Sequence, residues 1–460
     1  MNGMTPPIPD HPTLEDCVER SKLVRHVAQQ LAGCRPPQAF GVHGDWGAGK
    51  SSFLHQLRYH LTGEGLPGQP DGKAKVAKGN YKHRVVTVWF EAWRYQHEAV
   101  PVVALIQEIR RQFPLAEKVK DKFAKTGEVT FRSVLNGLDD AAKLIGLEAV
   151  PFSSKRIQDI GEQWERDHLA QRLATDSLQE YLTKVIEQLL KTISTKSNPN
   201  VRLVVLIDDL DRCGSEAAYR LLEGLKIYLN LPNCVFVLGM NQQAVVDAIA
   251  QNLPGARDKN EGELRLRAEA YLEKLCSVIW RLPLPASPKK LLLEWIVQAP
   301  DLHTALDKAL TDDTDGSEIR CLPPNPRRLK ALANLICRLH ATGESVSNKN
   351  EARRLLVVAY TYQFHADLFH RWQYDPDFFN EMRAWLRGGE SDPVKSKPYF
   401  KHLMLPISAT TNPKEPEVQF IWNKAFPDPG ACEVFWIAPL LVDETLKSTD
   451  FIPYLERGNV

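Results

Sequence analysis

The residue types best suited to chemistry lie between His43 and Ser51, in the segment HGDWGAGKS. Gly44 and Gly49 are the two glycines of the pattern G-x-x-x-x-G-K-[ST], and Lys50 and Ser51 are its last two positions. Glycines let the backbone curl so that its N–H groups point inward and form a nest for phosphate. The lysine then reaches the β- and γ-phosphates, and the serine hydroxyl binds Mg²⁺. The residues expected to contact a phosphate chain are Gly44, Asp45, Trp46, Gly47, Ala48, Gly49, Lys50, Ser51 and Ser52.

Two regular elements must flank such a loop, a strand before it and a helix after it. The run 39–43 (AFGVH) is short and apolar, which is typical of a buried strand. In the run 52–59 (SFLHQLRY), Phe53, Leu54 and Leu57 share one face of a helix. The start of that helix adds the positive end of its dipole to the loop. The sequence therefore predicts a strand–loop–helix unit.

Carboxylates follow a strongly apolar run further along the chain. Residues 201–207 (VRLVVLI) are nearly continuous in β-branched and apolar types, as expected for a strand buried on both faces, and DDLDR follows them. Acids at the carboxyl end of a central parallel strand lie where α/β sheets bind ligands. Asp208 is expected to hold Mg²⁺ opposite Ser51, and Asp209 to orient the attacking water. Asp211 either shares one of these tasks or caps the next helix.

Two further runs predict strands that end in a polar side chain. The run 234–240 (CVFVLGM) leads to Asn241, and the helix expected at 216–229 makes a β-α-β unit with parallel strands. Asn241 is expected beside the γ-phosphate or the attacking water as a polar sensor, and it also suits the cap of the following helix. The run 84–90 (RVVTVWF) leads to Glu91, which either touches the water or Mg²⁺ or stays outside the site.

Composition describes an ordinary soluble globular protein. The chain has 460 residues, 43% of them hydrophobic and 25% charged, with a formal net charge of +1. This length suits about three domains, or one large core with added helices. The near-neutral charge gives no overall field that recruits nucleic acid or acidic membranes. The eight cysteines are dispersed without a C-x-x-C pair, which argues against a zinc site and a disulfide framework. No signal segment or apolar run of roughly 20 residues appears, so we expect a cytoplasmic protein without a membrane span.

Together these segments resemble the KAP family of P-loop NTPases, a branch of the additional-strand NTPases. The resemblance covers about residues 10–340 and is carried by the phosphate loop, WFEAWRY at 89–95, DDLDR at 208–212, the strand ending at Asn241, YLEKL at 271–275 and NPRR at 325–328. It implies binding of ATP and Mg²⁺-dependent hydrolysis, with a long insertion at about 100–195. That insertion carries amphipathic segments in place of transmembrane helices, so the chain resembles the soluble bacterial branch.

The expected fold class is α/β. It comprises a three-layer P-loop NTPase core with a parallel sheet of the additional-strand type, a helical insertion, a helical lid and a helical C-terminal region. The expected parts are a lead segment at 1–35, the core at 36–285, the lid at 286–345 and a mostly helical domain at 346–460.

Three arginines have open assignments. Pro326 is suited to open a helix, which places Arg327 and Arg328 in its first turn, a poor position for cations unless an anion offsets them. The resemblance implies that one of the two reaches back to the γ-phosphate. The alternative is that both are solvated or pair with carboxylates such as Glu273. Arg212 either reaches the nucleotide of a neighbouring subunit or pairs locally within the DDLDR segment.

The function implied is a Mg²⁺-dependent ATPase that acts as a conformational switch or motor for a protein partner encoded nearby. A homo-oligomer is compatible with it. By analogy, soluble bacterial members often belong to phage defence operons. The alternatives are a nucleotide-binding scaffold with little hydrolysis and, less favoured, a P-loop kinase. The absence of the N-K-x-D motif of GTPases favours ATP over GTP.

Overall fold

The computed structural model describes residues 7–66, 78–81, 84–98, 101–112, 183, 186–187, 190, 194, 201–228, 231, 233–254, 260–343, 346–387, 394, 397–400, 402–405, 433–442 and 445–457. The chain divides into two compact units. We call Pro12–Pro283 the sheet unit, and Met1–His11 together with Leu284–Val460 the helical unit. Most of the predicted helical insertion at 100–195 lies outside the described residues.

The sheet unit is built on five parallel strands in the order β2-β3-β4-β1-β5. Their bounds are Gln38–His43 for β1, Arg84–Glu91 for β2, Val201–Asp208 for β3, Cys234–Met240 for β4 and Val278–Arg281 for β5. Every residue of β3 and β4 is buried, because both strands are covered on both faces. The register pairs Glu91 with Asp208 and His43 with Met240, so the carboxyl ends of four neighbouring strands align.

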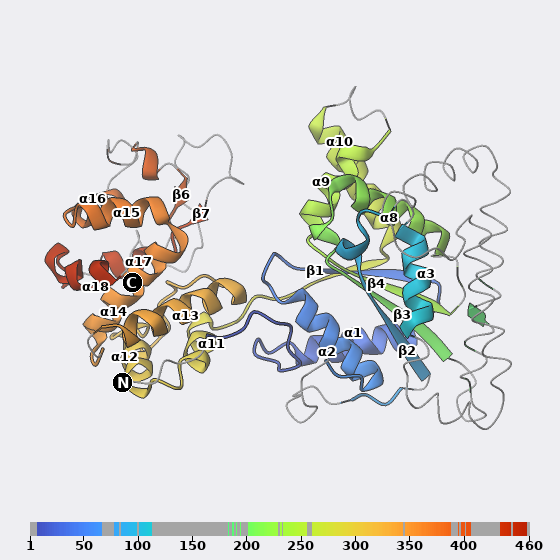
Figure 1. Ribbon diagram of the computed structural model, residues 1–460, viewed down its shortest axis with the longest axis horizontal. Helices are drawn as coiled ribbons and strands as arrows, with labels where there is room; N and C mark the ends of the chain where they lie inside the picture. Colours follow the sequence, from blue (N-terminus) through green and yellow to red (C-terminus); the bar gives the residue numbers. More distant parts are fainter. Residues whose placement is uncertain are drawn as a thin grey trace. The chain divides into compact units, whose positions relative to one another are not determined.

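Helices cover both faces of this sheet (Figure 1). The helices α1 (Ser21–Gly33) and α2 (Lys50–Thr62) lie on one face. On the other lie α3 (Pro101–Gln112), α8 (Ser215–Tyr228) and α9 (Gln242–Asn252), with α10 (Glu261–Leu275) packed on α9. Alternate residues of β4 enter the two cores, Val235 and Val237 on one side and Phe236 and Leu238 on the other. The predicted three-layer α/β class with a parallel sheet is confirmed.

The helical unit is centred on α14 (Lys349–Phe364), which has a run of fully buried residues from Leu355 to Tyr360. The helices that precede it in this unit are α11 (Pro288–Trp295), α12 (Pro300–Ala309) and α13 (Pro326–Ala341). It is followed by α15 (Ala366–Tyr374) and α16 (Phe378–Arg387). The remaining described elements are the short parallel strands β6 (Leu403–Met404) and β7 (Glu433–Val434) and the helices α17 (Ala438–Leu441) and α18 (Ile452–Arg457). The division of this unit into a lid and a C-terminal domain stays a prediction.

Candidate phosphate-binding site

The glycine-rich loop joins β1 to α2 and has the backbone that its sequence requires. Gly47 and Gly49 have φ values of 79° and 89°, in the left-handed region that favours glycine. The Gly44 N–H donates to the Met240 carbonyl at 3.2 Å, which ties the loop to the neighbouring strand β4. Lys50 is the first residue of α2, so the N-terminus of this helix faces the loop.

The Lys50 ammonium lies inside the loop in this structure. Lys50 is buried, and its Nζ donates to the Gly44 carbonyl at 2.9 Å and forms an ion pair with Asp211 Oδ2 at 3.2 Å. The sequence left Asp211 between two roles, a share in the Mg²⁺ and water chemistry or a helix cap. The structure pairs Asp211 with the lysine of the phosphate loop, and the two roles stay predictions.

Asp208 ends strand β3 as a buried carboxylic acid, 3% exposed. Ser51 donates a hydrogen bond to it, and among the described residues no donor reaches its Oδ1. Burial, followed by the negative charge of Asp209, raises the pKa of Asp208 to about 7. The absent side chain at Gly239 leaves room for it, since a Cβ there would lie 3.1 Å from Asp208 Oδ1. A divalent cation beside Ser51 fits this orphaned oxygen.

Asp209 is the first residue after β3 and has a left-handed backbone, with φ of 59°. Its Oδ1 pairs with Arg212 Nε at 2.8 Å, so Arg212 has a local partner. Burial raises the pKa of Asp209, and the charges of Asp211 and Glu91 add to that shift. Glu91 lies opposite Asp208 at the end of β2 and pairs with Arg94. The predicted acids therefore do meet at one edge of the sheet.

Asn241 follows β4 and begins the next helix. Its Oδ1 accepts the N–H groups of Gln243 at 3.0 Å and Ala244 at 3.3 Å, and its Nδ2 donates to Asp45 Oδ1 at 3.4 Å. The side chain is thus a helix cap that also touches the phosphate loop, and the two predicted roles are geometrically compatible. Trp46, in the same loop, is 63% exposed.

The charges at this sheet edge are unequally paired. Three of its acids each have a cation: Asp211 with Lys50, Asp209 with Arg212 and Glu91 with Arg94. Asp208 has no such partner among the described residues, and its buried carboxyl lies beside the Ser51 hydroxyl. The site therefore combines a glycine-rich loop, a lysine held inside it by Asp211, and one buried acid without a cation among the described residues.

The family model described as KAP family P-loop domain matches residues 20–342. The chain belongs to the KAP family of P-loop NTPases. No curated protein matches the chain. Within the described residues of this KAP protein, no helix is both long and apolar enough to cross a bilayer. Family membership makes the chain a nucleotide-binding NTPase of the P-loop type.

Sequence reasoning missed one residue of this KAP site, Arg20. Its guanidinium is buried and donates to the carbonyl of Ala48 in the phosphate loop at 2.7 Å. Nothing in the residue types around Arg20 marks it, because its acceptor is a backbone carbonyl and leaves no signature in the sequence. The available signal was the amphipathic pattern of Val24, Val27 and Leu31, which predicts the helix that Arg20 precedes.

Arg327 and Arg328, of which one is expected to reach the γ-phosphate, belong to the helical unit of the KAP chain. Asn325 caps α13, and Arg327 in its first turn pairs with Asp10 at 2.7 Å. The Arg328 guanidinium lies over the Phe364 ring, 4.3 Å from its centroid. The carboxylate partner of Arg327 is therefore Asp10 and differs from the suggested Glu273. Contact of either arginine with a phosphate stays a prediction.

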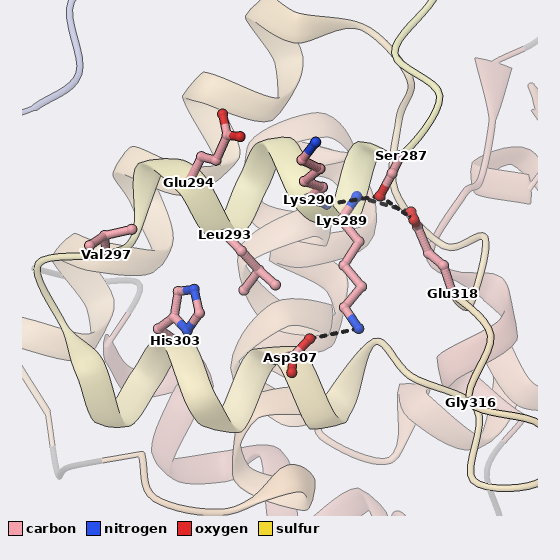
Figure 2. A pocket seen from close by; sticks show the side chains of 10 residues that line it. All are labelled: Ser287, Lys289, Lys290, Leu293, Glu294, Val297, His303, Asp307, Gly316 and Glu318. Carbon is pink, nitrogen blue, oxygen red and sulfur yellow. Dashed lines mark hydrogen bonds and ion pairs between the residues drawn. The ribbon is translucent and has the colours of Figure 1, made fainter. Parts of the chain in front are cut away.

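A hollow of about 530 Å³ lies in the helical unit, between α11 and α12 (Figure 2). Three of its charged side chains have local partners: Lys289 Nζ lies 2.7 Å from Asp307, and the Glu318 carboxylate accepts the Lys289 backbone N–H and the Ser287 hydroxyl. The contacts of Ser287 and Glu318 lie at the start of α11. Among the described residues, no group of His, Cys, Asp and Glu side chains is arranged to hold a metal ion by itself.

Proposed function

We propose that this KAP protein is a Mg²⁺-dependent ATPase that works as a conformational switch or motor for a partner protein. The observation that carries this proposal is the buried Asp208 carboxyl beside the Ser51 hydroxyl. A buried acid without a cation is costly, and proteins retain such groups mainly at functional sites. A Mg²⁺ ion held by these two residues and by the phosphates of ATP would balance the charge.

Different residues of the site bind the phosphates, the Mg²⁺ ion and the attacking water. The N–H groups of the loop and the start of α2 face the phosphates, and Lys50 exchanges its ion pair with Asp211 for the β- and γ-phosphates. Ser51 and Asp208 hold Mg²⁺, which when bound neutralises charge on the transferring phosphoryl group. Asp209 orients the attacking water, with Glu91 as the second acid at that edge.

Two contacts connect this chemistry to the rest of the molecule. Asn241 touches the loop through Asp45 and caps α9, so it is placed to sense the γ-phosphate and pass the change to a helix. Arg327 or Arg328 would reach the same phosphate from α13 and so link the helical unit to the nucleotide. We further propose a cytoplasmic location and a partner encoded nearby, and by family analogy a role in phage defence.

The proposal is tested by measuring phosphate release with Mg²⁺-ATP. We expect wild-type turnover, a loss of at least about 100-fold in Lys50→Ala and in Asp209→Asn, and dependence on Mg²⁺. Matched controls are Lys22→Ala, an exposed lysine of α1, and Glu216→Gln, an exposed acid of α8 that pairs with Arg220. Both controls should keep wild-type rates. A wild type that binds Mg²⁺-ATP with no turnover would contradict the hydrolytic role.

A nucleotide-binding scaffold with little hydrolysis is the second candidate. The observation that favours it is the ion pair between Asp209 and Arg212 at 2.8 Å, because this pair occupies one of the two carboxylate oxygens that could accept from the attacking water. Tight binding of ATP with very slow release of phosphate supports the scaffold. Faster turnover in Arg212→Ala than in the wild type would show that this pair restrains hydrolysis.

A further inference from the structure

Arg20 binds two distant parts of the sheet unit at once. Its Nη1 donates to the Ala48 carbonyl at 2.7 Å, while its Nε and Nη2 donate to the Pro283 carbonyl at 3.0 and 2.5 Å. The residue is 2% exposed. Ala48 lies in the phosphate loop, and Pro283 is the last residue of the sheet unit. One side chain thus joins the loop to the point where the chain leaves this unit.

The contact with Ala48 sets the direction of a loop amide. In a planar trans peptide the C=O and the following N–H point in opposite directions. Since Arg20 binds the Ala48 carbonyl, the N–H of Gly49 points away from the Arg20 guanidinium. Gly49 needs its left-handed φ of 89° for this arrangement, and a Cβ there would lie 3.3 Å from Arg20 Nη1.

Arg20 also places a buried positive charge under the loop. Its guanidinium hydrogen bonds within the described residues end on carbonyl oxygens, while Asp16 accepts the backbone N–H groups of Arg20 and Ser21 at 2.6 and 2.7 Å. Burial lowers the pKa of Arg20 to about 10, and the charge of Asp16 opposes that shift. Arg20 stays cationic at neutral pH, so its charge favours an anion in the loop.

The second contact extends this arrangement to the edge strand β5. The chain after β5 is fixed to the end of β1 by the Leu282 N–H, which donates to the His43 carbonyl at 2.8 Å. Arg20 then binds the next carbonyl, that of Pro283. Arg20 therefore connects the loop to the exit of the sheet unit, in addition to the backbone bond between Leu282 and His43.

We propose that Arg20 is a positioning residue of the nucleotide site, which holds the phosphate loop in its anion-binding conformation and links it to Pro283. This inference rests on the proposed function, since it assumes that the loop binds nucleotide. It assigns no contact between Arg20 and the nucleotide.

A matched control separates positioning from stability. Arg202, at the start of β3, is also buried and also donates to two backbone carbonyls, those of Leu31 at 2.5 Å and Cys34 at 2.7 Å. Its acceptors lie at the other end of α1, away from the phosphate loop. Loss of either guanidinium should lower the melting temperature, but only loss of Arg20 should change the binding of nucleotide.

The experiment measures the Kd of a fluorescent ATP analogue, with and without Mg²⁺, and the Tm of each variant of the full chain. We expect Arg20→Met to raise Kd about 10-fold or more, Arg20→Lys to recover most of this loss, and Arg202→Met to stay within about twofold of the wild type. If Arg20→Met does not fold, Arg20→Gln replaces it, because it keeps one N–H donor in the buried site.

The outcomes distinguish this inference from the proposed function. A wild type that does not bind the analogue contradicts the nucleotide site itself. A wild type that binds, with equal Kd values in the Arg20 variants and Arg202→Met, overturns the positioning role and leaves the proposed function intact. A rise in Kd in Arg20→Met that Arg20→Lys largely reverses, at a Tm loss in Arg20→Met similar to that of Arg202→Met, supports it.

Discussion

At the scale of the residue, the site is governed by which acids have a cation. The cation of Asp211 is the Lys50 ammonium, which nucleotide binding must release, whereas Asp208 lies buried beside Ser51 without a cation among the described residues. The Lys50–Asp211 pair competes with the phosphates of ATP for the ammonium, and the buried Asp208 carboxylate is unfavourable until a Mg²⁺ ion balances its charge. Each can be tested by replacing a carboxylate with its amide, which preserves the shape and removes the charge.

Replacement of Asp208 by Asn is expected to change how stability depends on pH. The pKa of Asp208 is raised from 3.8 to about 7 in the folded state, so the folded protein binds this proton more tightly than the unfolded chain. The stabilisation that this proton gives to the folded state is complete below about pH 4 and is lost as pH rises through 7. Without ligand, Asp208→Asn should therefore melt a few degrees above the wild type at pH 8, and less so at pH 5.

Thermal unfolding followed by circular dichroism checks this difference, with Glu216→Gln as the control for an exposed acid. Equal melting temperatures of wild type and Asp208→Asn at pH 8 would mean that the buried carboxyl carries no such cost. Added Mg²⁺-ATP should reverse the order, because it stabilises the wild type through Asp208.

Replacement of Asp211 by Asn tests the competition for Lys50. The Lys50–Asp211 pair at 3.2 Å is buried, so nucleotide must displace it before the ammonium can reach a phosphate. Removing the carboxylate also removes a repulsive charge near the phosphates. We expect Asp211→Asn to lower the Kd for Mg²⁺-free ATP about 3- to 10-fold in a titration, whereas an unchanged or weaker affinity would indicate that Asp211 orients Lys50 for binding.

At the scale of the element, the sequence predicted the strands that have long apolar runs. The strands β3 and β4 are buried along their whole length, so their apolar runs identified them and the polar residues at their ends. The edge strand β5 has four residues, one of them buried, and left no comparable pattern. The helix at 21–33 was not predicted, although its apolar spacing is regular. Within the region 346–460, which was predicted to be mostly helical, α14 ends before His365, where φ is −140°, and α15 begins after it.

The sequence indicated which residues gather at the sheet edge but not how they pair. The order of strands β2, β3 and β4 brings Glu91, Asp208 and Asn241 to one edge once parallel pairing is assumed. The pairing of Lys50 with Asp211 depends on side-chain torsions that residue spacing does not fix. Arg20 lay beyond prediction for a related reason, because a bond from a side chain to a distant carbonyl is recorded only by the fold.

At the scale of the whole molecule, the chain divides after Pro283, two residues beyond β5. The phosphate loop lies in the sheet unit, and Arg327 and Arg328 lie in the helical unit. A switch ATPase needs a nucleotide-dependent change in the arrangement of such units, which requires contacts that differ between its states. An arginine that binds the γ-phosphate from the other unit would supply that difference.

Small-angle scattering with Mg²⁺ and a non-hydrolysable ATP analogue tests this link. We expect the analogue to change the radius of gyration of the wild type, and Lys50→Ala, Arg327→Ala or Arg328→Ala to reduce the response. Arg338→Ala is the matched control, because Arg338 also lies on α13 and its guanidinium stands over the Tyr362 ring of α14, as that of Arg328 stands over Phe364. Its loss removes the same kind of packing without a proposed phosphate contact. If the radius of gyration responds equally in all three arginine variants, the contact that links the helical unit to the γ-phosphate belongs to other residues.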